Sequence, residues 1–202
     1  EICACLVGSE MCIRDRDSMV IATPFDAPRA FYYNQKINCM PASGVMTLGS
    51  RRFEFAPETS FGTLDWGRGV WTYDNTWYWG NGNGIVNGKP FGFNIGYGFG
   101  NTSAASENLL LYGGVAHKLS RVQFNIPEES FLKPWTFSSD DGRFEMDFVP
   151  VIDRVARTNA LIIESDQHQV FGRFTGRAVL DDGTPLELKD FLGFAEKVRN
   201  RY

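Results

Sequence analysis

The feature that most constrains the fold is a segment, residues 65–100, in which aromatic side chains and glycines alternate. Within it stands Asn87-Gly88, the dipeptide preferred in a two-residue type I′ turn, because both central residues of that turn need a positive φ. A turn at this dipeptide pairs Val86 with Lys89 and predicts a long β-hairpin. Bulky rings on one strand then face glycines on the other, which lets a ring lie across the neighbouring strand.

The register of this hairpin sorts its side chains onto two faces, because successive residues of a strand point to opposite sides of the sheet. Trp79 falls opposite Gly96, and Gly82 falls opposite Phe93. One face mixes indole and amide side chains and the other carries phenyl and phenol rings; the members are Trp77, Trp79, Asn81, Asn83 and Asn94 on the first, and Tyr78, Tyr97, Phe91 and Phe93 on the second. Such a ribbon suits a strongly curved sheet or barrel with an aromatic interior.

Strand-like segments fill the rest of the chain and are separated by tight-turn sequences. The Gly-Gly pair at 113–114 and the Asp-Asp-Gly sequences at 140–142 and 181–183 indicate hairpin turns. Residues 144–148 alternate apolar and charged side chains, which is typical of a strand buried on one face. At 191–198 a helical stripe competes with a closing strand, and we prefer the strand. We expect an all-β fold, an antiparallel meander that forms a calycin- or lipocalin-like barrel or a strongly curved sheet.

The N-terminal segment differs from the rest of the chain. Residues 1–16 hold three of the four cysteines, and the run 6–15 resembles the translation of a transposon-end sequencing adapter. We therefore expect 1–16 to be an artefactual or disordered segment, and 17–202 to be a single all-β domain that forms the C-terminal part of a longer protein. Cys39 is then the one remaining cysteine, which excludes a disulfide scaffold and favours a reducing, cytoplasmic location.

The bulk composition excludes several classes of function. The chain has 202 residues, enough for one large all-β core, and a formal net charge of −4. This mildly acidic balance, without Lys/Arg clusters, argues against a nucleic-acid partner. No apolar run is long enough to form a transmembrane helix. The common nucleotide, hydrolase and zinc-protease motifs are absent and the chain has two histidines, so we expect no cofactor and no metal site.

Three titratable residues that stand near aromatic or apolar segments are candidate catalytic groups. Asp65 begins the aromatic segment, and Glu107 precedes the apolar run 109–111, where a carboxylate beside a buried strand can have a raised pKa and act as an acid or base. His168 shares the strand face of Val170, and an interior histidine could exchange protons with a ligand. Each also has a structural interpretation: Asp65 could pin a turn, Glu107 could be an exposed strand start, and His168 could be a satisfied core histidine.

A second set of residues is expected to line a pocket for an apolar ligand. If the indole face of the hairpin points inward, the glycines opposite leave room for a flat or elongated molecule. If it points outward, the tryptophans form a dimer or domain interface, and burial of the rings in a core is a third alternative. The expected ligand-binding residues are Trp66, Arg68, Trp71, Trp77, Trp79, Asn94 and Asn108.

A series of motifs, in unbroken order, resembles an uncharacterised family. The motifs are LDWGRGVW, TWYWGNGNG, SENLLLY, AHKL, KPWTF, DRVARTN, HQVFGRFTG and LGFAEKVRNRY. The family is labelled domain of unknown function twenty-eight oh-four, and the resemblance covers nearly all of 19–202. Because full-length members are longer, the resemblance implies that this chain is their C-terminal half and that the missing N-terminal half is a partner. It implies no reaction, because none is established for the family.

A more distant similarity is to the lipocalin-like barrels of hydroxyneurosporene synthase and tocopherol cyclase, which hold long isoprenoid or polyketide substrates between two barrel-like domains. Their W-x-D-x-x-W signature is similar to Trp66, Arg68 and Trp71, with Arg68 in place of the acid, which argues against their acid-catalysed chemistry. The similarity favours an apolar small-molecule ligand such as a lipid, an isoprenoid or a polyketide, held in an apolar cavity of the barrel. The alternatives are an isomerase or lyase acting on such a ligand, and a structural half-domain that docks on the missing N-terminal region.

Overall fold

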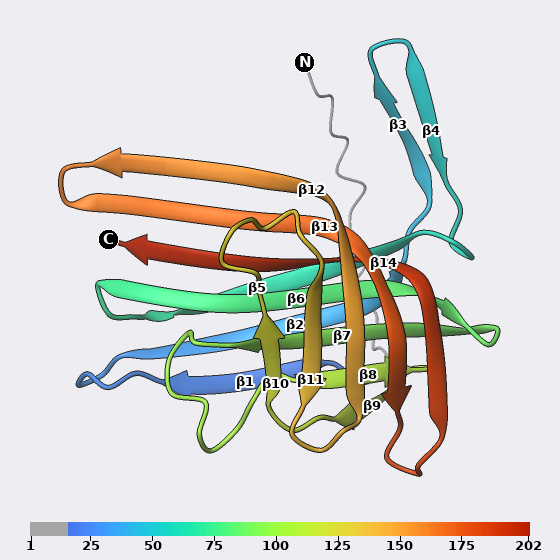
Figure 1. Ribbon diagram of the computed structural model, residues 1–202, viewed down its shortest axis with the longest axis horizontal. Coiled ribbons are helices and arrows are strands. Elements are labelled where there is room, and N and C mark those ends of the chain that lie inside the picture. The colour runs from blue at the N-terminus through green and yellow to red at the C-terminus, as the bar shows by residue number, and fades with distance from the viewer. Residues whose placement is uncertain (1–15) are drawn as a thin grey trace.

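The computed structural model describes residues 16–202, and every regular element in that range is a β-strand (Figure 1). The strands are, in chain order, β1 (Met19–Pro24), β2 (Phe31–Pro41), β3 (Gly44–Leu48), β4 (Arg51–Phe55), β5 (Phe61–Val70), β6 (Asp74–Val86), β7 (Lys89–Tyr97), β8 (Leu109–Tyr112), β9 (Val115–Lys118), β10 (Val122–Asn125), β11 (Trp135–Ser139), β12 (Phe144–Ala160), β13 (Ile163–Val179) and β14 (Pro185–Arg201). The predicted all-β class is confirmed. Apart from Arg16, the N-terminal segment 1–16 lies outside the described residues. The described residues contain no helix long and apolar enough to cross a membrane.

The strands form a large sheet, a small sheet and a separate hairpin, all antiparallel. The nine-stranded sheet has the order β10-β11-β12-β13-β14-β6-β7-β8-β9, the three-stranded sheet has the order β1-β2-β5, and β3 pairs with β4 alone. In Figure 1 the long strands β12, β13 and β14 bend near their middles, so the nine-stranded sheet curls. The ladders shift register between Pro150 and Ile152 and between Phe174 and Gly176, and such bulges increase the local bend of a sheet. The predicted strongly curved sheet is confirmed as a curled half-barrel.

The hairpin β6–β7 has the predicted register. Val86 pairs with Lys89 and Trp79 pairs with Gly96. Asn87 and Gly88 have φ values of 48° and 75°, as a type I′ turn requires. The C-terminal segment is also a strand, as preferred, but β14 lies inside the nine-stranded sheet between β13 and β6 rather than at its edge.

Aromatic rings fill the concave side of the curled sheet. Phe91, Phe93 and Phe174 are fully buried there, and the rings of Phe93 and Phe174 lie 4.9 Å apart. Further fully buried side chains of this core, from β7, β8, β11, β12, β13 and β14, are Ile95, Leu110, Trp135, Phe137, Phe144, Phe148, Val170 and Leu186. This aromatic core occupies the concave side of the half-barrel, so space for a ligand beside the tryptophans of the hairpin would lie on the other side of the sheet.

The three-stranded sheet covers the convex side of the nine-stranded sheet over β6 and β7. Strand β2 contacts both β6 and β7, and β5 contacts β6. The indole face of the hairpin therefore points away from the aromatic core and toward a second layer. This arrangement leaves a space between the two sheets that the core does not fill.

Candidate functional site

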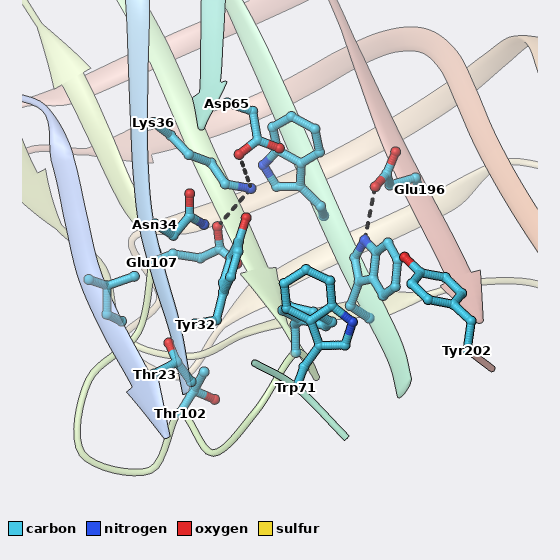
Figure 2. Close-up of a pocket in the computed structure, with 14 residues that line it drawn as sticks. Thr23, Tyr32, Asn34, Lys36, Asp65, Trp71, Thr102, Glu107, Glu196 and Tyr202 are labelled. Atoms are coloured by element: carbon cyan, nitrogen blue, oxygen red, sulfur yellow. Dashed lines mark hydrogen bonds and ion pairs between the residues drawn. The ribbon is translucent and has the colours of Figure 1, made fainter. Parts of the chain in front are cut away.

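A cavity of about 220 Å³ lies between the three-stranded sheet and the convex face of β6 (Figure 2). Its walls come from β1, β2, β5, β6, β14, the C-terminus, the loop that precedes β6 and the loop that follows β7. The lining residues are Ile21, Thr23, Tyr32, Asn34, Lys36, Asp65, Trp71, Trp77, Trp79, Phe99, Thr102, Glu107, Glu196 and Tyr202. Aromatic rings and charged groups face the same space, which distinguishes the cavity from the aromatic core.

Strand β2 contributes three polar side chains to the cavity because of its register with β5. Lys36 stands opposite Asp65, whereas Asn34 and Tyr32 stand opposite glycines. The Tyr32 ring occupies the space that a Cβ on Gly67 would need. The glycines of β5 therefore allow the tyrosine to lie against that strand and leave the cavity open beside it.

Lys36 joins two carboxylates in the cavity. Its Nζ lies 3.2 Å from Oε2 of Glu107 and 3.8 Å from Oδ1 of Asp65, and 3.7 Å from the ring centroid of Trp79. The Lys36 side chain is only 6% exposed, so the ammonium depends on these partners in place of water. Burial raises the pKa of the Asp65 carboxyl above its ordinary value, and the nearby Lys36 charge opposes that shift.

Glu196 brings a third carboxylate from β14. Its Oε1 accepts a hydrogen bond of 3.1 Å from the indole N–H of Trp77, and its Oε2 accepts one of 3.0 Å from the Gln169 amide. Burial raises the pKa of Glu196, while the two hydrogen bonds act in the opposite direction. A carboxyl with a raised pKa beside a ligand space can act as a proton donor or acceptor.

A network of asparagines holds Trp79 and Glu107 from behind. Oδ1 of Asn94 accepts a 2.7 Å hydrogen bond from the indole N–H of Trp79, and Nδ2 of Asn94 donates to Oε2 of Glu107 at 3.0 Å. The network continues to β2, where Nδ2 of Asn38 donates to Oδ1 of Asn81 at 3.0 Å. These side chains connect the two sheets and fix the orientation of both the indole and the carboxylate.

The position of Glu107 also requires a glycine on β7. A Cβ on Gly96 would lie 2.6 Å from Oε1 of Glu107, closer than real atoms approach. The backbone N–H of Gly96 donates a 2.7 Å hydrogen bond to Asn108, whose Nδ2 donates to the carbonyl of Ser120 at 3.0 Å. Asn108 therefore anchors the loop that carries Glu107. The Asn108 side chain itself lies behind the cavity.

The structure brings half of the predicted site residues into the cavity, namely Asp65, Glu107, Trp71, Trp77 and Trp79. Asn94 and Asn108 lie one layer behind and make the hydrogen bonds described above. Trp66 and Arg68 do not line the cavity, because alternate residues of a strand point to opposite faces and Asp65 takes the inner one. Trp66 is 45% exposed on the outer face of the three-stranded sheet, where its ring contacts that of Tyr33.

His168, the third catalytic candidate, lies in a separate depression of the surface. Its Nδ1 is 2.7 Å from Oδ2 of Asp153, and its ring stacks on Phe131 with 3.9 Å between centroids. Its Nε2 lies 3.1 Å from the guanidinium of Arg157. Both ring nitrogens are thus engaged, and the histidine is not brought together with the other two candidates.

Sequence reasoning missed several residues of the cavity, above all those of β2 and β14. A signal for the first group exists: Tyr32, Asn34 and Lys36 alternate along one face of a strand, which would bring all three to the same space. For Glu196 the signal is weaker, since the acid stands among apolar residues of a segment that also fits a helix.

Comparison with known proteins identifies the family and no closer relative. The sequence matches the family model described as Domain of unknown function (DUF2804) over residues 9–202. No curated protein and no solved structure matches the chain. The matched range includes every residue that lines the cavity. The chain therefore belongs to the DUF2804 family.

Proposed function

We propose that this protein binds a small molecule with an apolar body in the cavity between its two sheets. The observation that carries the proposal is the convergence of aromatic rings in this cavity. The ring centroid of Phe99 lies 5.2 Å from that of Trp77 and 5.6 Å from that of Trp71, so the rings form a continuous wall. Ligand pockets usually measure roughly 300–1,000 Å³, so a cavity of about 220 Å³ suits a ring or a short chain. The rest of the ligand would extend past Trp71 and the half-exposed Tyr202.

Tryptophan variants test the proposal. Retinol, a fluorescent polyene, is titrated into wild-type protein and into the Trp71→Ala and Trp79→Ala variants. Loss of one buried apolar contact costs about 1.5–3 kcal/mol, so each variant is expected to bind at least about tenfold more weakly. Trp66→Ala is the matched control, because it removes an indole from the outer face and should leave the affinity unchanged. Unchanged affinity in Trp79→Ala, with a native circular dichroism spectrum, would contradict the pocket.

A second candidate function is an isomerase or lyase of the hydratase or cyclase type, acting on a ligand in the same cavity. It is favoured by Asp65 and Glu107, which face the cavity on either side of Lys36, and by the raised pKa values of Asp65 and Glu196. One carboxyl would donate a proton to the ligand and another would accept one. Incubation of unsaturated isoprenoids with the protein in D₂O tests this, since deuterium incorporation should disappear in Asp65→Asn and Glu107→Gln. Equal incorporation in those variants would exclude both residues.

We further propose that the outer face of the three-stranded sheet docks on the preceding part of a longer chain. Its support is a group of exposed apolar side chains on β1, β2 and β5: Val20, Phe31, Tyr33, Leu64, Trp66 and Val70. Apolar patches of this kind commonly mark interfaces. Hydrogen exchange of β2 and β5 in a longer protein should be slower than in this chain, and equal exchange would contradict the docking.

A cytoplasmic location is part of the same proposal. Its support is that Cys39 is the one cysteine of residues 16–202 and forms no disulfide, as is usual for proteins of a reducing compartment. The side chain is buried, and burial raises the pKa of its thiol to about 12. A thiol of this kind is kept in its inert protonated form. Fractionation of cells that express the tagged protein tests the location.

A further inference from the structure

The charged groups of the cavity do not balance. Three carboxylates, those of Asp65, Glu107 and Glu196, face the space together with one ammonium, that of Lys36. Tyr32, a neutral neighbour, lies close enough to feel these charges: its pKa is raised first by burial and then by the charges of Asp65 and Glu107. A bound molecule therefore meets a negative field that Lys36 only partly cancels.

A buried hydrogen-bond acceptor in the same cavity lacks a donor. Asn34 is 2% exposed, and within residues 16–202 its Oδ1 has no hydrogen-bond partner. Figure 2 shows Asn34 beside Lys36 and Glu107 on the cavity wall. A buried polar atom left unpaired costs about 1–3 kcal/mol. Oδ1 itself has almost no exposed surface, so a ligand N–H in the cavity would relieve that cost once the Asn34 amide rotates to bring the oxygen to the cavity wall. The side chain points to a ligand that donates hydrogen bonds, independently of the charge balance.

The aromatic wall suits a cation as well as an apolar chain. Lys36 already shows the preference, since its ammonium lies 3.7 Å from the Trp79 ring centroid. Tyr32 and Trp71, whose centroids are 6.1 Å apart, offer further rings to the same cavity. Aromatic faces attract cations, and they do so more strongly where water is excluded.

From these three observations we infer that the ligand is an amphiphilic amine, with an apolar body and a protonated amino group. The amino group donates to Asn34 Oδ1 and pairs with Asp65 and Glu107, and the apolar body lies along Trp71 and the rings beside it. The inference rests on the proposed binding function and names the chemical class of its ligand. A carboxylate ligand would instead meet two carboxylates at the same point, together with a Lys36 ammonium that is already paired with both.

Three molecules of equal chain length separate the effect of the head group from that of the chain. Decylamine, decanol and decanoate are titrated calorimetrically into the protein at neutral pH, each below its micelle concentration, with retinol as the reference. Decylamine is expected to bind at least about tenfold more tightly than decanol, because a hydrogen-bonded charge pair contributes more than about 1.4 kcal/mol. Decanoate is expected to bind most weakly.

Carboxylate variants assign the preference to the cavity. Asp65→Asn and Glu107→Gln should each weaken decylamine binding about tenfold and leave decanol binding unchanged. Glu54→Gln is the matched control, since Glu54 is exposed on the separate β3–β4 hairpin. Two variants are used so that one remains informative if the other fails to fold, as judged by circular dichroism.

The outcomes separate this inference from the proposed function. Equal affinity for decylamine and decanol, or tighter binding of decanoate, would overturn the amine and leave the apolar pocket in place. A decylamine preference that survives in both carboxylate variants would also overturn it. If retinol and all three decyl compounds fail to bind, the proposed function itself is wrong.

Discussion

The two faces of the β6–β7 hairpin share one backbone but bury different chemistry. On the concave face, Phe91 and Phe93 are fully buried in a continuous aromatic core. On the convex face, Trp79 borders a cavity, and hydrogen bonds join it to Asn94 and, through Asn94, to Asn81. Strand alternation alone separates the two sets, since neighbours along the strand point in opposite directions. The comparison teaches that the core face supplies stability, and that the polar face holds side chains in place around a space that stays open.

The largest expected effect lies on the core face. Phe93→Ala removes a fully buried ring that lies 4.9 Å from Phe174 and 5.3 Å from Phe144, and should lower the free energy of unfolding by about 3–5 kcal/mol. Urea unfolding measures this change. The matched control is Phe53→Ala on the exposed β3–β4 hairpin, where we expect less than about 1 kcal/mol. Similar costs for the two variants would mean that the concave face does not supply the stability.

The second effect is expected in the asparagine network of the convex face. Nδ2 of Asn38 donates to Asn81, Asn83 and the carbonyl of Phe93, so Asn38→Ala removes one donor from each of these acceptors. Asn81 keeps a donor in Thr63, and Asn83 keeps one in the backbone N–H of Cys39. The expected loss is about 2 kcal/mol, measured by urea unfolding. Because the same network holds Trp79, the tryptophan fluorescence emission of the Asn38→Ala variant should also differ from that of the wild type. A loss below about 0.5 kcal/mol would show that water replaces the side chain without cost.

The sequence is sufficient to predict one part of this comparison. The register of β6–β7 follows from Asn87-Gly88, because turn chemistry is local and settles the pairing of all residues that follow. That one face of the hairpin is phenyl-rich and the other mixes indole and amide is equally predictable. The face on which the cavity lies is not predictable from the hairpin, because both faces carry large rings. The position of the second sheet, β1-β2-β5, decides which face of the hairpin meets polar side chains.

The site is less predictable than the hairpin for the same reason. Lys36 meets Asp65 across the β2–β5 ladder and Glu107 from a loop far along the chain, and no local pattern specifies these meetings. The sequence predicts Trp66 and Arg68 to line the cavity with Trp71. Strand alternation argues against that assignment once Asp65 points inward.

A third variant disturbs the close packing of Glu107 against β7. Gly96→Ala places a methyl group 2.6 Å from Oε1 of Glu107 and 2.9 Å from the backbone oxygen of Tyr78, so the carboxylate must move. Overpacking of this kind costs about 1–3 kcal/mol, and we expect about 2 kcal/mol, because the carboxylate can shift whereas the backbone oxygen of Tyr78 cannot shift cheaply. Gly62→Ala is the matched control, since its nearest contact would be an ordinary 3.5 Å. Equal stabilities of the two variants would show that Glu107 does not depend on the glycine.

The smallest effect concerns the pH dependence that Glu196 gives to the polar face. Burial raises the pKa of Glu196 in the folded protein above its ordinary value of 4.5, so the folded state binds this proton more tightly than the unfolded state. The stability that Glu196 contributes is therefore fully present below pH 4.5 and is lost as the pH rises through the raised folded value. Glu196→Gln removes this titration, so the unfolding free energy of the wild type, relative to the variant, should fall with rising pH.

Urea unfolding across this pH range measures the difference, with Glu187→Gln as the control because Glu187 is exposed on the same strand. A difference that instead rises with pH would mean that the hydrogen bonds from Trp77 and Gln169 outweigh the cost of burial. The convex face would then add to stability through its ionised carboxylates, and the contrast with the phenylalanine core would disappear. If the difference in unfolding free energy falls with rising pH, the ionised Glu196 lowers the stability of the polar face, and the phenylalanine core offsets that loss.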